Sequence, residues 1–169
     1  MGARVLTWLT DKNGAAFRAR AYAPEDRRAL EAMYQDFEPR RAAQGLPPAD
    51  SARTRQWLAR VLASGLHFVA EQDGRIVGHA MLVPIDEQEG LELANFVHQS
   101  ARGRGIGTAL NQMAVEAARA NGCARLWLSV EPSNRAALRS YEKVGFRMLP
   151  GSWWAPEVEM AIDLAPEPA

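Results

Sequence analysis

The chain has 169 residues, a length at which a single domain can bury a sizeable apolar core. Its 20 Lys+Arg residues balance its 20 Asp+Glu residues, and this zero net charge removes the general electrostatic case for binding nucleic acid or an anionic membrane surface. The single cysteine, Cys123, excludes an internal disulfide and a multi-cysteine metal site. Any site for an anion must therefore be local.

The sequence gives no support for a membrane span, a secretory signal or a metal site. No apolar run approaches the roughly 20 residues that a helix needs to cross a bilayer. The N-terminal segment 1–14 is a poor secretory signal, because its apolar stretch is short and broken by Thr7 and Thr10. None of the histidines has a partner at helical ligand spacing, so no metal is expected. We therefore expect a cytoplasmic protein.

Hydrophobic periodicity and turn residues divide the chain into strands and helices. Residues 17–22 alternate apolar and basic side chains, as expected for a half-buried strand. The dipeptide Asp73-Gly74 lies between two apolar runs and is a strong hairpin signal. The expected elements, in chain order, are a strand at 17–22, a helix that begins at Pro24 and ends before Pro39, a helix at about 51–63, strands at 67–72, 75–85 and 91–98, a helix to about residue 120, a strand at 123–130, a helix from Pro132 to Lys143, and strands at 145–149 and 157–164.

These elements indicate one α+β domain over residues 1–169, with its core at about 17–164, a short N-terminal extension and a frayed C-terminal tail. The strand at 123–130 is a short continuous apolar run, so we expect it to lie near the centre of a sheet. The sequence contains no internal repeat, low-complexity tract or linker that would divide the chain further.

The segment ARGRGIGT (101–108) joins the strand at 91–98 to the next helix and carries three alternating glycines. Glycines let the backbone turn tightly and approach a ligand closely. The helix beyond offers unpaired N–H groups and the positive end of its dipole to a phosphate. Arg102 and Arg104 add positive charge that suits a polyphosphate. The alternative is a glycine-rich helix start that binds no ligand and whose arginines are solvated.

The sequence of this segment does not match either of two common phosphate-binding motifs. A Walker A loop needs Gly-Lys-Ser/Thr, and here Gly107 is followed directly by Thr108. A dinucleotide-binding fingerprint needs a third glycine at position 108 and a place after the first strand of a βαβ unit, and the segment has neither.

The segment instead resembles the pyrophosphate loop of the GNAT acyltransferase superfamily. Residues 102–107 match that family's pattern Q/R-x-x-G-x-G/A. Downstream, the chain carries LWLSV (126–130), Asn134 and YEKVGF (141–146) in the family's order and spacing. The resemblance covers about residues 17–164 in element order and is tightest from 91 to 146.

The resemblance implies a three-layer αβα fold with a mixed, mostly antiparallel sheet of six to seven strands, splayed between the fourth and the fifth. Acetyl-CoA would bind as co-substrate, without a metal, in the cleft between strands 91–98 and 123–130. Asn134 would contact its pantetheine arm, with a plain helix-start position as the alternative, and Ser133 is a better helix-cap candidate than a catalytic residue. The residues that the resemblance assigns to acetyl-CoA binding are Val97, Arg102, Gly103, Arg104, Gly105, Ile106, Gly107, Thr108 and Asn134.

The chemistry that the resemblance implies is direct attack of a neutral amine on the thioester. Tyr141 would donate a proton to the departing thiolate, with a plain core position as the alternative. Glu92, the only carboxylate within 91–98, is the candidate general base, and a surface glutamate is its alternative. Asn95 could hold a water, but strand alternation puts it on the opposite face from Glu92 unless a bulge intervenes. Backbone N–H groups near such a bulge would stabilise the oxyanion.

In this superfamily the first two helices and their connection usually wall the acceptor site. Arg40, Arg41, Arg53 and Arg55 make this region basic, which would suit an acceptor with a carboxylate or phosphate, whereas a solvated loop is the alternative. The pair Trp153-Trp154 would pack on the core or line the acceptor pocket, and we favour packing. The acceptor itself stays open among small amines, amino acids, antibiotics and proteins.

The resemblance thus implies an acetyl-CoA-dependent N-acetyltransferase that acts on a primary amine of a small molecule or a protein. A non-catalytic acyl-CoA-binding or sensing module of the same fold is the alternative. A nucleotide- or nucleic-acid-binding protein is disfavoured by the neutral charge and the missing Walker lysine. The expected partners are acetyl-CoA and an amine acceptor, not nucleic acid or a membrane, and a homodimer is left open.

Overall fold

The computed structural model describes residues 7–39, 47–48, 50–85 and 90–164. In these residues, eight strands form one sheet in the order β1-β2-β3-β4-β5-β6-β8-β7. All neighbouring strands are antiparallel except β5 and β6, which run parallel. The elements are β1 (Thr7–Thr10), β2 (Ala16–Ala21), α1 (Arg27–Gln35), α2 (Ser51–Val61), β3 (Leu66–Gln72), β4 (Arg75–Pro84), β5 (Leu91–Val97), α3 (Ile106–Ala120), β6 (Arg125–Val130), α4 (Arg135–Lys143), β7 (Arg147–Met148) and β8 (Val158–Asp163).

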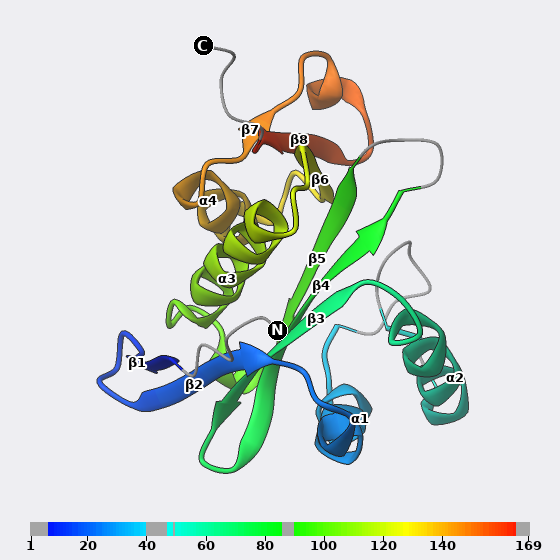
Figure 1. Cartoon of the computed structure of the whole chain (residues 1–169), viewed down its shortest axis with the longest axis vertical. Coiled ribbons are helices and arrows are strands. Elements are labelled where there is room, and N and C mark those ends of the chain that lie inside the picture. Colours follow the sequence, from blue (N-terminus) through cyan, green and yellow to red (C-terminus); the bar gives the residue numbers. More distant parts are fainter. Residues whose placement is uncertain (1–6, 40–46, 49, 86–89, 165–169) are drawn as a thin grey trace.

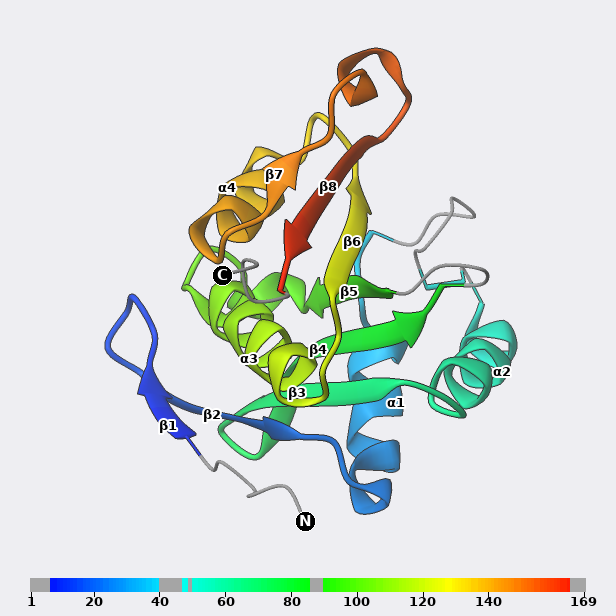
Figure 2. The same ribbon diagram turned by 45° about the horizontal axis from the view of Figure 1, so that its top comes forward.

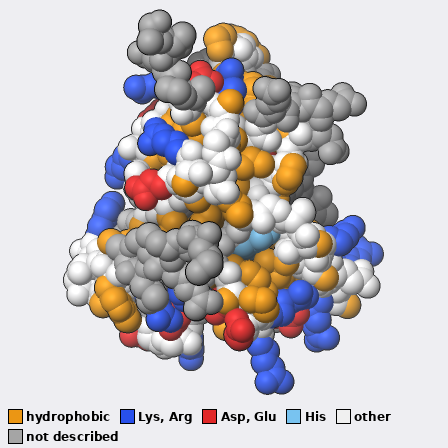
Figure 3. All heavy atoms as spheres, in the orientation of Figure 1, with side chains coloured by type: hydrophobic (Ala, Val, Ile, Leu, Met, Phe, Trp, Pro, Cys, Tyr) orange, Lys and Arg blue, Asp and Glu red, His pale blue; other side chains and the backbone are white. Residues whose placement is uncertain are grey.

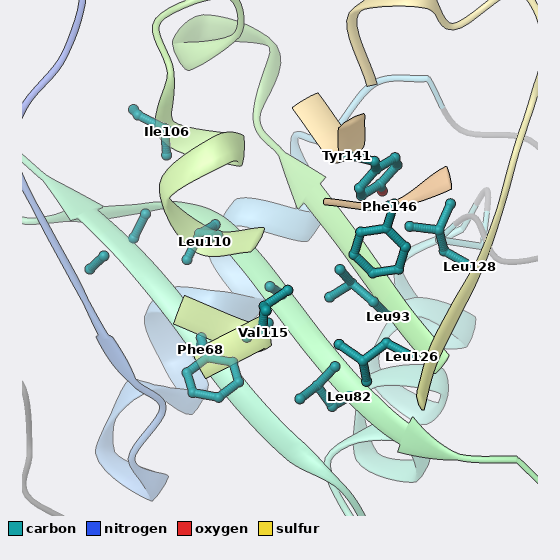
Figure 4. Packing of buried hydrophobic residues seen from close by; sticks show 14 of the residues in the cluster. Phe68, Leu82, Leu93, Ile106, Leu110, Val115, Leu126, Leu128, Tyr141 and Phe146 are labelled. Atoms are coloured by element: carbon teal, nitrogen blue, oxygen red, sulfur yellow. The ribbon is translucent and has the colours of Figure 1, made fainter. Parts of the chain in front are cut away.

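Helices cover both faces of the sheet (Figure 1). Helices α1 and α2 pack on one face through a buried cluster that includes Leu30, Tyr34 and Leu58. Helices α3 and α4 pack on the other face, where Leu110 and Phe146 belong to a larger apolar cluster (Figure 4). This three-layer arrangement confirms the expected fold class, and the sheet has one strand more than the largest number expected.

The additional strand is β1, which pairs with β2 at the edge of the sheet. Four residues carry too short a pattern to predict a strand, so the segment was expected to be an extension. The turn after β1 is built around Asp11, whose Oδ1 accepts hydrogen bonds of 2.9 Å from the backbone N–H groups of Asn13 and Ala15. The turn fixes β1 against β2, since so short a strand has little stability of its own.

Two helix starts differ from expectation, and the predicted hairpin is confirmed. The first helix opens with a 3-10 turn at Pro24–Asp26 before α1 begins. Of the two helix-start candidates, Asn134 caps α4 and Ser133 does not, because Asn134 Oδ1 accepts the N–H of Ala137 at 3.2 Å. Asp73 and Gly74 adopt φ values of 51° and 72°, the left-handed conformation that a two-residue hairpin loop requires.

The sheet is splayed between β5 and β6, as the resemblance implied. These strands pair at only two positions, Leu91 with Leu126 and Glu92 with Trp127. Beyond them, β5 forms no described ladder with β6, which pairs instead along its whole length with β8. Figure 2 shows β6 and β8 turned across the direction of β4 and β5.

A chain of polar side chains runs from the buried Tyr34 and His79 to the partly exposed His67. The Tyr34 hydroxyl lies 2.6 Å from His79 Nδ1, and His79 Nε2 lies 3.1 Å from His67 Nδ1. His67 Nε2 lies 2.7 Å from the Ser64 carbonyl oxygen, which can only accept a hydrogen bond. Burial, helped by the neighbouring His67, lowers the pKa of His79 to about 3, so this ring is neutral near pH 7.

Candidate functional site

A cleft of about 760 Å³ opens where the sheet splays. It runs from the loop after β5, past the first turn of α3, to the end of β6 and the facing side of α4. In Figure 3, Lys and Arg side chains lie mainly around the margin of the molecule, and hydrophobic side chains run through the middle of the face shown. On the face shown, the basic side chains therefore do not form one broad patch over the middle.

The loop at one end of the cleft brings the start of α3 to the ligand space. Gly105 adopts φ 89° directly before Ile106, the first residue of α3, and caps the helix without a side chain. Gly107 lies so close to β5 that a Cβ there would stand 3.3 Å from Val97 Cγ2. The first N–H groups of α3 are therefore presented at a part of the cleft where side chains are small.

The two arginines of the loop are bound to the protein itself. Arg102 lines the cleft, but its Nε donates to the Val97 carbonyl oxygen at 2.9 Å, and a second guanidinium nitrogen donates to the Glu38 carbonyl oxygen. Arg104 donates to the Ser100 carbonyl oxygen at 2.7 Å and pairs with the buried Asp11 at 3.7 Å. Arg104 is the one predicted acetyl-CoA-binding residue that does not line the cleft.

A chain of polar side chains crosses the interior between β5, α3 and α4. Asn95 Nδ2 donates to the Gly107 carbonyl oxygen at 2.9 Å and to Asn111 Oδ1 at 2.7 Å. Asn111 Nδ2 donates to Ser140 Oγ at 3.0 Å, and Ser140 Oγ lies 2.9 Å from Thr108 Oγ1. The chain links the glycine loop to the residue that precedes Tyr141.

Tyr141 lies where α4 faces the cleft. Its ring is almost fully buried, with 7% of the residue exposed, and packs edge-to-face on Phe146 at 5.9 Å between ring centroids (Figure 4). Burial raises the pKa of Tyr141 to about 12, so the hydroxyl keeps its proton at neutral pH. A protonated phenol that lines the cleft is able to donate a hydrogen bond or a proton to a bound group.

Glu92 and Asn95 line the same cleft from opposite faces of β5. The pairing of β5 with β4 is continuous, so no bulge of the kind considered from the sequence alters the alternation. The walls of the cleft around Glu92 and the negative charge of Glu157 raise the pKa of the Glu92 carboxyl. Its proton affinity is therefore higher than that of an ordinary surface glutamate.

The predicted acceptor residues do not gather at the cleft. Arg53 and Arg55 are exposed on α2, outside the lining, while Arg40 and Arg41 lie outside the described residues. Trp154 is 94% exposed, so the favoured packing role is wrong for this residue, and the side chain of Trp153 lies outside the described part.

Several residues that line the cleft were not predicted from the sequence. Lys12 approaches from the β1–β2 turn, Asn111 from α3, Ser140 from α4 and Glu157 from the segment before β8. The dipeptide Asn13-Gly14 is a hairpin signal that could have located the β1–β2 turn. Asn111 and Glu157 carry no comparable local signal.

The described residues contain no group of three or more His, Cys, Asp or Glu side chains placed to hold a metal ion. In the same part of the chain, no helix combines the length and the apolar character needed to cross a bilayer.

The sequence profile of the Acetyltransferase (GNAT) family matches residues 28–146. The chain belongs to this family. Family members use acetyl-CoA, and the GNAT resemblance of the glycine loop is thereby confirmed at the level of the family.

Among curated GNAT relatives, an uncharacterized N-acetyltransferase of Mycobacterium tuberculosis is 38% identical over 82 residues, which is 48% of this chain and 52% of that protein. The [ribosomal protein bS18]-alanine N-acetyltransferase of Escherichia coli is 32% identical over 96 residues, 53% of this chain and 64% of that protein. The chain spans about half the length of the first curated relatives it matches.

Solved GNAT structures share the fold at low sequence identity. The GNAT domain of the S. lividans protein PAT superposes with a TM-score of 0.75 at 18% identity, covering 94% of this chain and 97% of that one. A putative acetyltransferase of Salmonella typhimurium, solved with acetyl-CoA, gives a TM-score of 0.71 at 20% identity and covers 90% and 96% of the two chains.

Proposed function

We propose that the protein transfers the acetyl group of acetyl-CoA to a primary amine by direct attack in a ternary complex. The observation that carries this proposal is one continuous cleft that joins the glycine loop at the start of α3 to Tyr141 and Glu92. Such a cleft can hold a phosphate-bearing donor at one end and reacting groups at the other.

The donor would lie along the splay. Its pyrophosphate would accept hydrogen bonds from the N–H groups at the start of α3, where the helix dipole also favours an anion. Its pantetheine arm would pair with the open edge of β5 near Val97, much as an added strand pairs with a sheet. Asn134, whose Oδ1 caps α4, keeps its amide NH₂ available for this arm.

The reaction would then need two proton movements. A free lysine-like amine has a pKa of about 10.4 and must lose a proton before it attacks. Glu92, which lines the cleft, would accept that proton directly or through a water. The amine nitrogen forms a bond to the thioester carbonyl carbon, and collapse of the tetrahedral intermediate breaks the C–S bond. The Tyr141 hydroxyl would give its proton to the departing sulfur.

The acceptor would enter beside Glu92 and Glu157, which line the end of the cleft away from the loop. Two carboxylates there suit an acceptor that arrives as an ammonium ion. The earlier expectation of an anionic acceptor rests on arginines that are either off this lining or outside the described residues. A small molecule and a protein amine both satisfy this chemistry.

The test is release of free thiol from acetyl-CoA against a panel of small amines and peptides. We expect acetyl-CoA to raise the melting temperature and at least one amine to stimulate thiol release. A melting temperature that does not move at millimolar acetyl-CoA would contradict the proposal. Stabilisation without thiol release for any amine would favour the non-catalytic acyl-CoA-binding module.

A further inference from the structure

The turn between β1 and β2 lies against the glycine loop. The backbone N–H of Lys12 donates to the Arg104 carbonyl oxygen at 3.0 Å. The Lys12 side chain then passes Gly105, such that a Cβ on Gly105 would stand 3.8 Å from Lys12 Cε. Lys12 thereby lines the cleft beside the residue that caps α3.

The turn is anchored by Asp11, whose side chain is fully buried. Its Oδ2 accepts a hydrogen bond of 3.0 Å from Gln72 Nε2 and lies 3.7 Å from the Arg104 guanidinium. The hydrogen bond from Gln72 is the chief reason that the pKa of Asp11 lies below its ordinary value. The carboxylate is therefore charged near pH 7 and holds the turn to β3 and to the loop.

The three cations at this end of the cleft differ in whether their charged groups already have partners within the protein. The guanidinium groups of Arg102 and Arg104 are directed to main-chain carbonyl oxygens and to Asp11. Lys12 Nζ, in contrast, has no hydrogen bond or ion pair with the described part of the chain. A lysine held by its backbone, with its ammonium group unpaired at a cleft, is suited to a mobile anion such as a phosphate.

We propose that Lys12 binds the pyrophosphate of acyl-CoA from the side opposite α4, an inference that rests on the proposed function. Arg139 and Lys143 line the cleft from α4 and are available to other phosphate groups of the ligand. Lys12 lies instead at Gly105, where the pyrophosphate would meet the first N–H groups of α3. The β1–β2 turn thus contributes a cation that the glycine motif itself does not supply.

Calorimetric titration with CoA and with dephospho-CoA, which lacks the 3′-phosphate but keeps the pyrophosphate, tests this inference. Lys12→Met removes the charge and keeps the aliphatic stem along Gly105. We expect it to weaken binding of both ligands about tenfold, the size of one charge-assisted hydrogen bond. Lys12→Arg should retain most of the affinity. The loss should shrink as salt rises, because exposed charges are screened.

Asn13→Ala is the matched control, since Asn13 is an exposed residue of the same turn that contributes only its backbone N–H to Asp11. It should bind both ligands as the unchanged protein does, and a melting curve of each variant checks the fold. Equal affinity of Lys12→Met and the unchanged protein would overturn the inference, as would a loss seen with CoA but absent with dephospho-CoA. Failure of the unchanged protein to bind either ligand would overturn the proposed function itself.

Discussion

At the loop end of the cleft the lining includes main chain, glycines and the cation Lys12, whereas at the far end it includes the Tyr141 hydroxyl and the carboxylates of Glu92 and Glu157. The first end is suited to hold a polyanion through N–H groups that any sequence can supply once the backbone turns correctly. The second end depends on individual side chains, and the surroundings of Tyr141 and Glu92 raise the pKa of both groups. Variants at the two ends should therefore fail in different ways.

Tyr141→Phe should have the largest effect, and it should impair catalysis without weakening the binding of CoA. Loss of the hydroxyl removes the proposed proton donor, so kcat should fall roughly a hundredfold or more. The Kd for CoA should stay close to that of the unchanged protein, because the loop end is untouched. Steady-state kinetics and calorimetry together measure this split, and equal losses in both would assign the tyrosine a structural role only.

The next largest effect is expected from acid, which should lower the stability of the protein through the buried side chain of His79. His79 is buried and neutral with a pKa near 3, whereas an unfolded histidine titrates near 6.5. As the pH falls through 6.5, the unfolded histidine takes up a proton that the folded ring does not. The free energy of unfolding should then fall with a slope that approaches about 1.4 kcal/mol per pH unit, until the pH reaches the folded pKa of about 3. Burial also lowers the pKa of His67, which adds to the slope.

Denaturant unfolding between pH 7 and pH 5 measures this slope. His79→Gln removes the group that must be protonated and should flatten the pH dependence, although the variant itself will be less stable. An unchanged slope in His79→Gln would show that other groups cause the acid sensitivity.

Gly105→Ala should weaken the loop end. An alanine at φ 89° is strained by roughly 1–2 kcal/mol, so the affinity for CoA should fall about tenfold with kcat at saturation preserved. Gly122→Ala is a matched control, because Gly122 also has a positive φ of 73° and open space around it, but lies outside the cleft lining. The control should lose stability and keep its affinity, and a similar loss of affinity in both variants would contradict the proposed role of the loop.

Ser140→Ala should have the smallest effect, and it should slightly lower both the affinity for CoA and kcat. It leaves the buried Asn111 NH₂ without its acceptor, which should cost about 1 kcal/mol of stability, measured by denaturant unfolding. Because the chain through Ser140 joins Thr108 to the turn that carries Tyr141, both CoA affinity and kcat should fall a few-fold. Ser133→Ala, at an exposed serine, should change neither. A loss confined to one end would mean that the chain does not couple the two.

The sequence could predict what depends on a contiguous pattern. The glycine loop, Asn134 and Tyr141 lie within short motifs, and the splayed sheet follows from the family that those motifs indicate. The roles of Tyr141, Glu92 and the loop residues in binding and catalysis stay predictions. Helix α3 packs against both the sheet and α4, so the polar Asn111 is buried together with the apolar residues of the helix.

What the sequence could not predict depends on contacts between distant segments. The direction of the Arg104 side chain is decided by Asp11 and Ser100, on a different strand end and a different turn. The hydrogen-bonded chain from Asn95 to Ser140 needs the registers of a strand and two helices to coincide. No local periodicity contains that information.

The position of the short strand β1 implies that its stability depends on whether a ligand is bound in the cleft. Among the described strands it pairs with β2 alone, and its turn contacts the glycine loop through Lys12 and Asp11. If a ligand holds that turn, part of the binding free energy is transferred by thermodynamic linkage to the edge strand. The amide hydrogens of Thr7–Thr10 should then exchange with solvent more slowly when CoA is bound, which would make the N-terminal edge a sensor of a ligand that it does not touch.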